Sequence, residues 1–217
     1  FLVFSAHKMY APFGTGVLIG PTSFFQKGEP DYSGGGTVDL VNLHTVIWDT
    51  PPEKDEAGTP NIMGVVALVA AIKTLTNIGM DNIKKYEDSL TKYAISKLKN
   101  INNIELYGLK DSVEDRLGII PFNIKGIHHE KLAKILASEK GIAVRSGCFW
   151  AHAFVKQLLG RSKEEARTFM RMAKNKRPGM VRISFGIYNT YKEIDILVDL
   201  LEDIASNKNY FLEKYKD

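Results

Sequence analysis

The chain has 217 residues, and its content of 44% hydrophobic, 25% charged and 10% aromatic residues excludes disordered, collagen-like and low-complexity proteins. A net charge of +4 is too modest to predict a nucleic-acid partner. The longest apolar run, residues 62–72, is too short to span a bilayer, so no membrane partner is expected. A single cysteine, Cys148, excludes an internal disulfide and a multi-cysteine zinc site, and it fits a reducing compartment, the cytoplasm.

The first 100 residues are predicted to form the end of an α/β domain and a linking helix. Residues 1–4 are a continuous apolar run without a charged leader, typical of a strand buried on both faces of a sheet, and they predict a start within a longer protein. A helix over Ile62–Ile78, capped by Asn61, is apolar on nearly all sides and is expected to be central. Further strands are expected at residues 15–20, 38–41 and 45–48, and an amphipathic helix at residues 81–100.

Residues 101–217 are predicted to form a small α+β C-terminal domain, so the expected division falls at residue 100. Two capping boxes, Ser162 with Glu165 and Thr190 with Glu193, indicate helix starts. The pair His128 and His129 is expected to open a helix rather than to bind a ligand. Strands are expected at residues 104–107, 118–124, 142–145 and 181–185, and helices at residues 128–139 and 191–205.

A group of polar side chains, Ser5, His7 and Lys8, directly follows the first predicted strand. Ligand-binding residues of α/β folds lie at the carboxyl ends of strands. A lysine that is partly desolvated there has a lowered pKa and is available for Schiff-base chemistry, while a hydroxyl and an imidazole suit a phosphate. An ordinary solvated loop lysine is the alternative interpretation of the same spacing.

Four motifs in order resemble one family, the class V aminotransferases of the fold-type I pyridoxal-phosphate enzymes, which contain the cysteine desulfurases. The segment from Ser5 to Gly16 resembles the cofactor-lysine segment, and Glu-Ala-Gly-Thr-Pro at residues 56–60 resembles a turn of that family. Residues 141–147 resemble the strand into its catalytic loop, and residues 181–190 its carboxylate-binding strand. The resemblance implies an α/β fold: the C-terminal part of the large cofactor domain in residues 1–100, then the small domain.

The resemblance also implies roles for individual residues. Lys8 forms a Schiff base with pyridoxal phosphate and moves the Cα proton of the substrate. Ser5 and His7 hold the cofactor phosphate, and Thr59 reaches it across a dimer interface. Arg182 binds the substrate carboxylate, which suits a planar guanidinium. Arg145 is a second cation nearby, with a structural ion pair as the alternative.

The catalytic loop departs from the family pattern. In the group II desulfurases the persulfide-forming cysteine stands where this chain has Trp150, and the only thiol, Cys148, lies two residues earlier. In an extended loop two residues displace the sulfur by roughly 6–7 Å, which is too far for attack on a substrate thiol. Whether Cys148 serves as the catalytic thiol is therefore open. A metal site begun by Cys148 and His152 is disfavoured, and the sequence identifies no partner for His44.

The sequence predicts a pyridoxal-phosphate enzyme that acts on a cysteine-like amino acid as a cysteine desulfurase, working as a homodimer with a sulfur-acceptor protein as a possible partner. The groups that stack on the cofactor ring and pair with its nitrogen lie upstream of the lysine in the family, so the chain resembles its C-terminal half. Two alternatives remain. One is a transaminase or carbon–sulfur lyase that needs no persulfide, and the other is a catalytically impaired fragment acting as a partner subunit.

Overall fold

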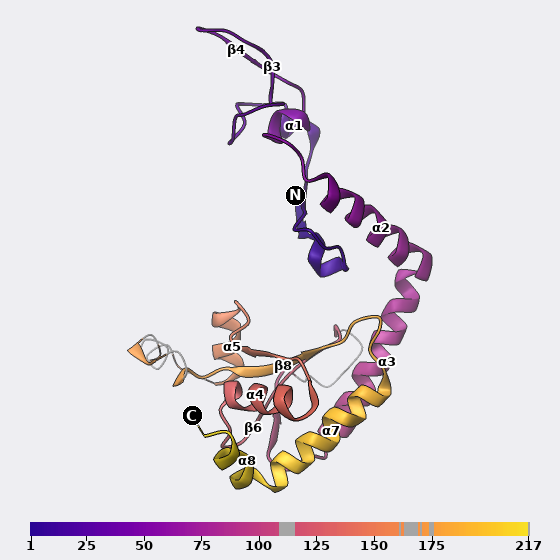
Figure 1. Cartoon of the computed structure of the whole chain (residues 1–217), viewed down its shortest axis with the longest axis vertical. Coiled ribbons are helices and arrows are strands. Elements are labelled where there is room, and N and C mark those ends of the chain that lie inside the picture. Colours follow the sequence, from indigo (N-terminus) through magenta and orange to yellow (C-terminus); the bar gives the residue numbers. More distant parts are fainter. Residues whose placement is uncertain (109–115, 161, 163–168, 170, 174–175, 217) are drawn as a thin grey trace. The chain divides into compact units, whose positions relative to one another are not determined.

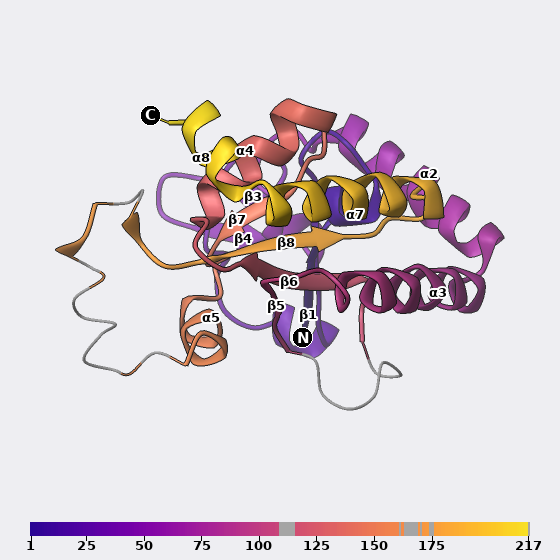
Figure 2. The ribbon, with the colours of Figure 1, turned by 90° about the horizontal axis from the view of Figure 1, so that it is seen from below.

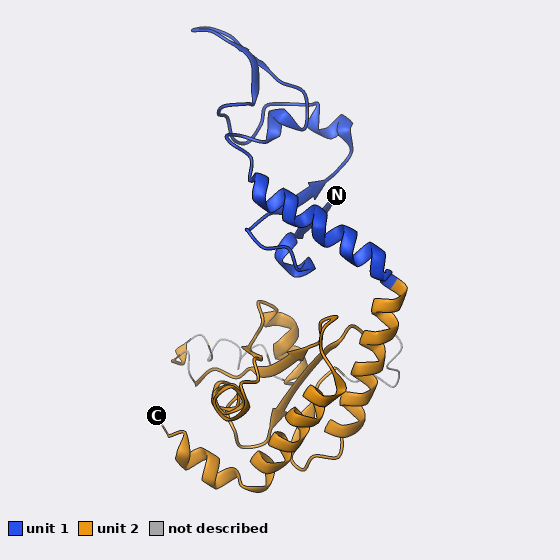
Figure 3. Ribbon diagram, turned by 45° about the vertical axis from the view of Figure 1, so that its right-hand side comes forward, with its two compact units in different colours: residues 1–80 blue, residues 81–217 orange. Residues whose placement is uncertain are grey.

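The computed structural model describes residues 1–108, 116–160, 162, 169, 171–173 and 176–216. The chain divides into two compact units, residues 1–80 and residues 81–217, which are coloured separately in Figure 3. Figure 1 labels their helices and strands. Each unit is described by itself below.

The first unit begins with a two-stranded antiparallel sheet of β1 (Leu2–Ser5) and β2 (Gly16–Ile19), in which Val3 pairs with Leu18. Both strands were predicted, but their burial was not as expected, since Val3 is 72% exposed. Two strands alone have no second layer to bury either face, and such a pair is only marginally stable. The apolar run is therefore a strand whose side chains remain largely in solvent in this chain.

Besides the first two strands and its long helix, this unit contains a second hairpin and three short helices. The hairpin pairs β3 (Val38–Val41) with β4 (Val46–Trp48), as predicted. The side chain of Lys54 is buried, and its ammonium donates to three backbone carbonyls, those of Phe25, Lys27 and Gly28. This contact ties two of the short helices together. The short helices, which the sequence did not predict, are η1 (Ala6–Met9), α1 (Thr22–Phe25) and η2 (Glu53–Asp55).

Helix α2 (Ile62–Ile78) has the predicted bounds and the predicted cap, since Asn61 Oδ1 accepts from the Gly64 amide at 3.0 Å. Its predicted central position is wrong for this chain. Met63 is 64% exposed, and Gly64 and Leu68 are the residues of α2 that are buried. In the part of the chain that the structure describes, no single helix is long and apolar enough to cross a membrane, although α2 and the next helix together meet those criteria.

The second unit is built on a four-stranded antiparallel sheet with the order β5-β6-β8-β7. Its strands are β5 (Ile104–Leu106), β6 (Ile119–Ile124), β7 (Arg145–Gly147) and β8 (Met180–Ser184). Strand β7 begins at the residue where the sequence expected it to end. The reason is that the Gly141 and Ile142 amides bond the last carbonyls of the preceding helix, so residue 142 still belongs to that helix end.

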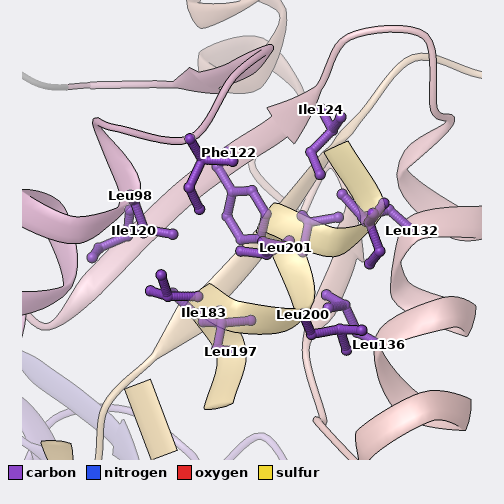
Figure 4. Packing of buried hydrophobic residues seen from close by; sticks show 14 of the residues in the cluster. Leu98, Ile120, Phe122, Ile124, Leu132, Leu136, Ile183, Leu197, Leu200 and Leu201 are labelled. Atoms are coloured by element: carbon purple, nitrogen blue, oxygen red, sulfur yellow. The ribbon is translucent and has the colours of Figure 1, made fainter. Parts of the chain in front are cut away.

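Helices α3 (Met80–Leu98), α4 (His129–Lys140) and α7 (Tyr191–Ser206) enclose the main core, and Figure 2 shows α4 and α7 on the same side of the sheet. Phe122 of β6 lies among leucines of α4 and α7 in this core (Figure 4). The α+β expectation for this unit is confirmed. The described residues of this unit also form two short helices, α5 (His152–Leu158) and α8 (Lys208–Lys214).

The division between the units falls after Met80, whereas the sequence placed it at residue 100. Leu90, Ala94 and Leu98 of α3 are fully buried in the core of the second unit, so the helix expected to link two lobes packs as part of the second. The predicted Thr190–Glu193 capping box is present at the start of α7. The other one, Ser162 with Glu165, lies outside the described residues.

The C-terminal helix is fastened to α4 through one carboxylate. Glu139 Oε1 accepts from Lys214 Nζ at 2.6 Å and from the Tyr215 hydroxyl at 2.7 Å. These bonds, from Lys214 first and Tyr215 second, hold the pKa of Glu139 below its ordinary value. The charged carboxylate therefore stabilises the fold above about pH 4.3, the unfolded value, and this stabilisation is lost as the pH falls through the lower folded value.

We expect Glu139→Gln to lower Tm at pH 7 because the amide loses the charge that both donors bond. At pH 3, below the unfolded value, part of the stabilisation by the charged carboxylate is already lost in the wild type, so the difference in Tm should shrink. Thermal unfolding followed by circular dichroism at both pH values measures this. The matched control is Glu213→Gln. Glu213 forms an ion pair with Lys216, three residues later, and because both side chains are exposed this pair contributes little to stability. An equal loss of Tm at both pH values would contradict the argument.

Candidate functional site

The turn that carries Lys8 is held firmly by backbone bonds. Ser5 ends β1 and stands at the N-cap of η1, but its side chain makes no capping bond. The Ala6 amide donates to Thr15 O at 2.8 Å, and the turn closes with Tyr10 in the left-handed region at φ 67°. The Ser5 hydroxyl is therefore not consumed by the helix start and remains available to a ligand.

Buried alanines pack this turn against α2, while its His7 and Lys8 side chains stay accessible. Ala6 and Ala11 are buried and cluster with Leu68 of α2. His7 and Lys8 are both exposed. The desolvation of Lys8 that the sequence predicted is not supplied by this chain, because none of its described elements covers the amine. The structure thus brings Ser5, His7 and Lys8 together on one short turn, with His7 and Lys8 exposed.

Thr59 lies on the turn before α2. Gly58 adopts a φ of 83° and its amide bonds Gly35 O at 2.8 Å, which fixes this turn to the glycine-rich loop. Two residues later, Asn61 Nδ2 donates to Phe13 O at 2.6 Å, next to the end of the Lys8 segment. Thr59 itself is exposed, and among the described residues no hydrogen bond joins it to Ser5, His7 or Lys8. Its predicted action across a dimer interface stays a prediction.

Gly64 explains why α2 can approach this segment. A Cβ on Gly64 would lie 1.8 Å from Thr15 Oγ1, so any larger residue would push the helix start away from the Lys8 segment. A cavity of about 480 Å³ also lies in this unit, bounded by Phe24, Tyr32 and Asp55. None of the four predicted cofactor residues lines it, so it is not the site that the sequence predicts.

The two predicted substrate arginines face each other in the second unit. Arg145 of β7 and Arg182 of β8 are directly paired across the sheet. The Nε of Arg182 is buried and has no hydrogen-bond partner among the described residues, and the guanidinium lies 5.1 Å from the centroid of the Phe149 ring. Burial first, and the charge of Arg145 second, lower the pKa of Arg182. Two opposed cations with an unused buried N–H favour an anion between or beside them.

Cys148, which follows β7, begins a tight turn and not the extended loop that the sequence argument assumed. The Ala151 amide donates to Cys148 O at 2.7 Å, and the two central residues, Phe149 and Trp150, have φ values of 52° and 62°. This is the pattern of a type I′ turn, which normally takes Asn and Gly. Two aromatic residues in the left-handed region are strained, at a cost of about 1 kcal/mol or more each, and strained turns cluster at functional sites.

The thiol and the indole of this turn differ in their exposure to solvent. Cys148 is half-buried, its Sγ lies 3.7 Å from Pro178 O, and burial raises the pKa of the thiol against the weaker opposing charge of Lys156. Trp150, at the tip, is 89% exposed. The displacement of 6–7 Å calculated for an extended loop therefore does not apply. The difference between the two positions is now one of burial.

The histidines lie at separate places in the two units. His152 begins α5, His44 is exposed in the β3–β4 loop, and His128 is the N-cap of α4, as expected for a residue that opens a helix. The described part of the chain contains no group of three or more His, Cys, Asp or Glu that could hold a metal ion. Two features of the site were not predicted from the sequence. They are the contact of the Arg182 guanidinium with the Phe149 ring and the burial of His129, and no local signal in the sequence indicates either one.

Comparison with known proteins found relatives that are described as cysteine desulfurases. A 37% identical relative, described as a probable cysteine desulfurase of Halalkalibacterium halodurans, matches 97% of this chain and 46% of its own length. Apo cysteine desulfurase from Thermococcus onnurineus superposes with a TM-score of 0.80 at 32% identity, and CsdA, a cysteine desulfurase of Escherichia coli, with 0.76 at 30%. Each superposition covers 94% of this chain and 46% or 45% of the other.

The chain thus spans about half the length of the relatives that it matches. Its fold is that of the corresponding part of the cysteine desulfurases. The family model described as aminotransferase class-V matches residues 1–197, which includes the Lys8 turn, the Arg145–Arg182 pair and the Cys148 turn. The chain therefore belongs to the class V aminotransferase family.

Proposed function

We propose that the protein to which this chain belongs is a pyridoxal-phosphate-dependent enzyme that removes sulfur from cysteine and leaves alanine. Membership of the class V family supports the reaction class, and relatives at 37% and 32% identity that are described as cysteine desulfurases support the substrate. The chain contributes the lysine turn of the first unit and the arginine pair of the second.

The residues of the Lys8 turn fit the proposed cofactor. Ser5 offers a hydroxyl that makes no capping bond, His7 an imidazole and Lys8 a primary amine, all on one short segment on which His7 and Lys8 are exposed. A hydroxyl and an imidazole bind phosphate oxygens, and an amine bonds covalently to an aldehyde carbon. When bound, pyridoxal phosphate supplies an electron sink for the Cα carbanion. Lys8 then holds and moves the Cα proton, while Thr59 of a second copy adds a phosphate contact.

The single observation that carries the substrate proposal is the unpartnered Nε of Arg182. A buried guanidinium N–H without a partner costs free energy, and the opposed charge of Arg145 increases that cost. A carboxylate, which accepts two parallel bonds from a guanidinium, removes both penalties. Every α-amino acid presents this group, so Arg182 orients the substrate and Arg145 adds a second positive charge.

Arg182→Lys tests this role in the complete enzyme. The ammonium keeps the charge but loses the bidentate bond, so we expect kcat/KM for cysteine to fall by about 10²-fold, mostly through KM. Sulfide release over a range of cysteine concentrations measures it, and Arg116→Lys, an exchange of an arginine that bonds backbone carbonyls elsewhere, is the control. An unchanged KM would remove Arg182 from the substrate site.

A second candidate function follows from the burial of Cys148. A carbon–sulfur lyase or a transaminase of the same family needs no persulfide, and the raised pKa of the half-buried thiol favours such a route. Product analysis separates the candidates. The desulfurase yields alanine from cysteine, the lyase yields pyruvate and ammonia, and the transaminase requires a keto acid as amino acceptor.

The proposed assembly is a homodimer in the cytoplasm that passes sulfur to an acceptor protein. Large apolar side chains exposed on β1 and α2, such as Val3 and Met63, support association of this unit with further polypeptide. The exposed aromatic tip at Trp150 is accessible to an acceptor. Sedimentation of the complete enzyme tests the dimer.

A further inference from the structure

Two adjacent histidines hold one backbone carbonyl of the second unit. The Nε2 atoms of His128 and His129 each lie 3.0 Å from Arg177 O, and the ring centroids are 4.2 Å apart. His128 Nδ1 accepts from the Glu130 amide, which leaves its Nε2 as the N–H donor. Since a carbonyl oxygen only accepts, His129 donates from Nε2 as well. The oxygen thus accepts two N–H bonds, one on each lone pair.

The backbone anchored in this way continues past the Cys148 thiol. The next carbonyl, Pro178 O, accepts from the thiol at 3.7 Å, and the one after it, Gly179 O, accepts from Asn123 Nδ2 at 3.0 Å. Residues 177–179 are thus anchored on both sides of the carbonyl that faces the sulfur. A bond donated by the neutral thiol stabilises that form over the thiolate.

His129 packs directly against this segment. Its side chain is 5% exposed, and a Cβ on Gly179 would lie 2.6 Å from His129 Nε2 and 2.7 Å from Gly147 Cα. The imidazole, the backbone at Gly179 and the end of β7 are therefore in close contact, with Cys148 immediately following. Loss of the imidazole removes both an anchor of Arg177 and the support under Gly179.

We propose that His129, assisted by His128, is a positioning residue that holds residues 177–179 against the Cys148 thiol and shields it from reagents and substrates. The inference rests on the proposed function in one respect, that the loop carrying this thiol belongs to the active site. The shielding itself can be measured without any turnover. Among the described residues, the titratable and charged groups that act on these two side chains are His128 and Glu130 on His129, and Lys156 on Cys148.

Alkylation by iodoacetamide tests the proposal without cofactor or substrate. Cys148 is the only cysteine of these 217 residues, so mapping of the labelled peptide that contains it reports this one thiol. We expect His129→Ala to raise the alkylation rate at pH 7.5 about tenfold, the change in thiolate fraction produced by a fall of one unit in apparent thiol pKa. The pH profile of the rate should move to lower pH. His129→Gln, which can donate to Arg177 O again, should restore the wild-type profile.

A second variant guards against a folding defect of His129→Ala. His128→Asn keeps a helix-capping side chain but is too short to reach Arg177 O, so it removes one anchor without opening the core. It should raise the rate by a smaller factor, about threefold, and His44→Ala, in the β3–β4 hairpin loop of the first unit, should leave it unchanged. Wild-type rates and pH profiles in both His128→Asn and His129→Ala would overturn the proposal. Failure of His129→Gln to restore the profile would overturn the hydrogen-bond role of His129.

Discussion

Lys8→Ala in the complete enzyme is expected to abolish sulfide release from cysteine, with kcat lower by at least about 10³-fold. Lys8 combines two roles in the proposed reaction, since it holds the cofactor and carries the Cα proton, and alanine removes both. Lys8→Arg should fail as well, because a guanidinium stays protonated and cannot accept that proton. The loss should appear in kcat rather than in KM, because the substrate carboxylate is bound elsewhere.

A chemical label identifies the residue independently of activity. Borohydride reduction of the complete enzyme fixes the cofactor on the lysine that holds it, and peptide mapping should find the pyridoxyl group on Lys8. Lys73→Ala, in an exposed position of α2, is the matched control and should keep both label and activity. A label on any other lysine would rule out Lys8 as the cofactor lysine.

Trp150→Cys is expected to raise sulfide release at neutral pH at least about tenfold, whereas Cys148→Ala should change it little. The reason is burial, since position 150 is the exposed tip of the turn, while the thiol at 148 is half-buried with a raised pKa. Each unit of pKa removed from a thiol increases its thiolate fraction about tenfold near neutral pH. An exposed cysteine at the tip is both better ionised and free to reach a bound substrate.

The control for this exchange is Trp150→Ser, which removes the indole from the same turn without adding a thiol. If the serine variant gains as much activity as the cysteine variant, the indole acts only as a steric obstacle. The opposite result for Cys148 is equally informative. If Cys148→Ala abolishes a robust activity and alkylation traps a persulfide on Cys148, the buried thiol is the catalytic one.

Local signals in the sequence were sufficient for most of the elements. Helix α2 was predicted to the residue because an asparagine cap and an apolar run mark its start, and Thr190 with Glu193 marked the start of α7. Strand β7 was misplaced because the bonds that end α4 extend to Ile142, one residue beyond the glycine that marks the helix end. Burial of α2 was also mispredicted. An apolar composition shows that a helix favours a buried position, but it does not show whether other elements are present to cover it.

The candidate site was predictable only as separate motifs. Residue order placed Ser5, His7 and Lys8 on one turn and indicated Arg145 and Arg182, but the pairing of the arginines required the sheet register. The turn at Cys148 was unpredictable because aromatic residues in its left-handed positions have no matching propensity. The contact of His129 with Arg177 joins residues 48 apart, so it arises from packing alone.

The unequal cores of the two units determine where this polypeptide opens first. In the first unit the buried hydrophobic cluster consists of Ala6, Ala11 and Leu68, whereas the second has a continuous core around Phe122. Local opening costs little free energy where few apolar contacts are lost. Proteases should therefore cut the first unit well before the second. The segment that we propose to hold the reactive amine thus has little stability of its own, and in the proposed enzyme its persistence depends on association with further polypeptide.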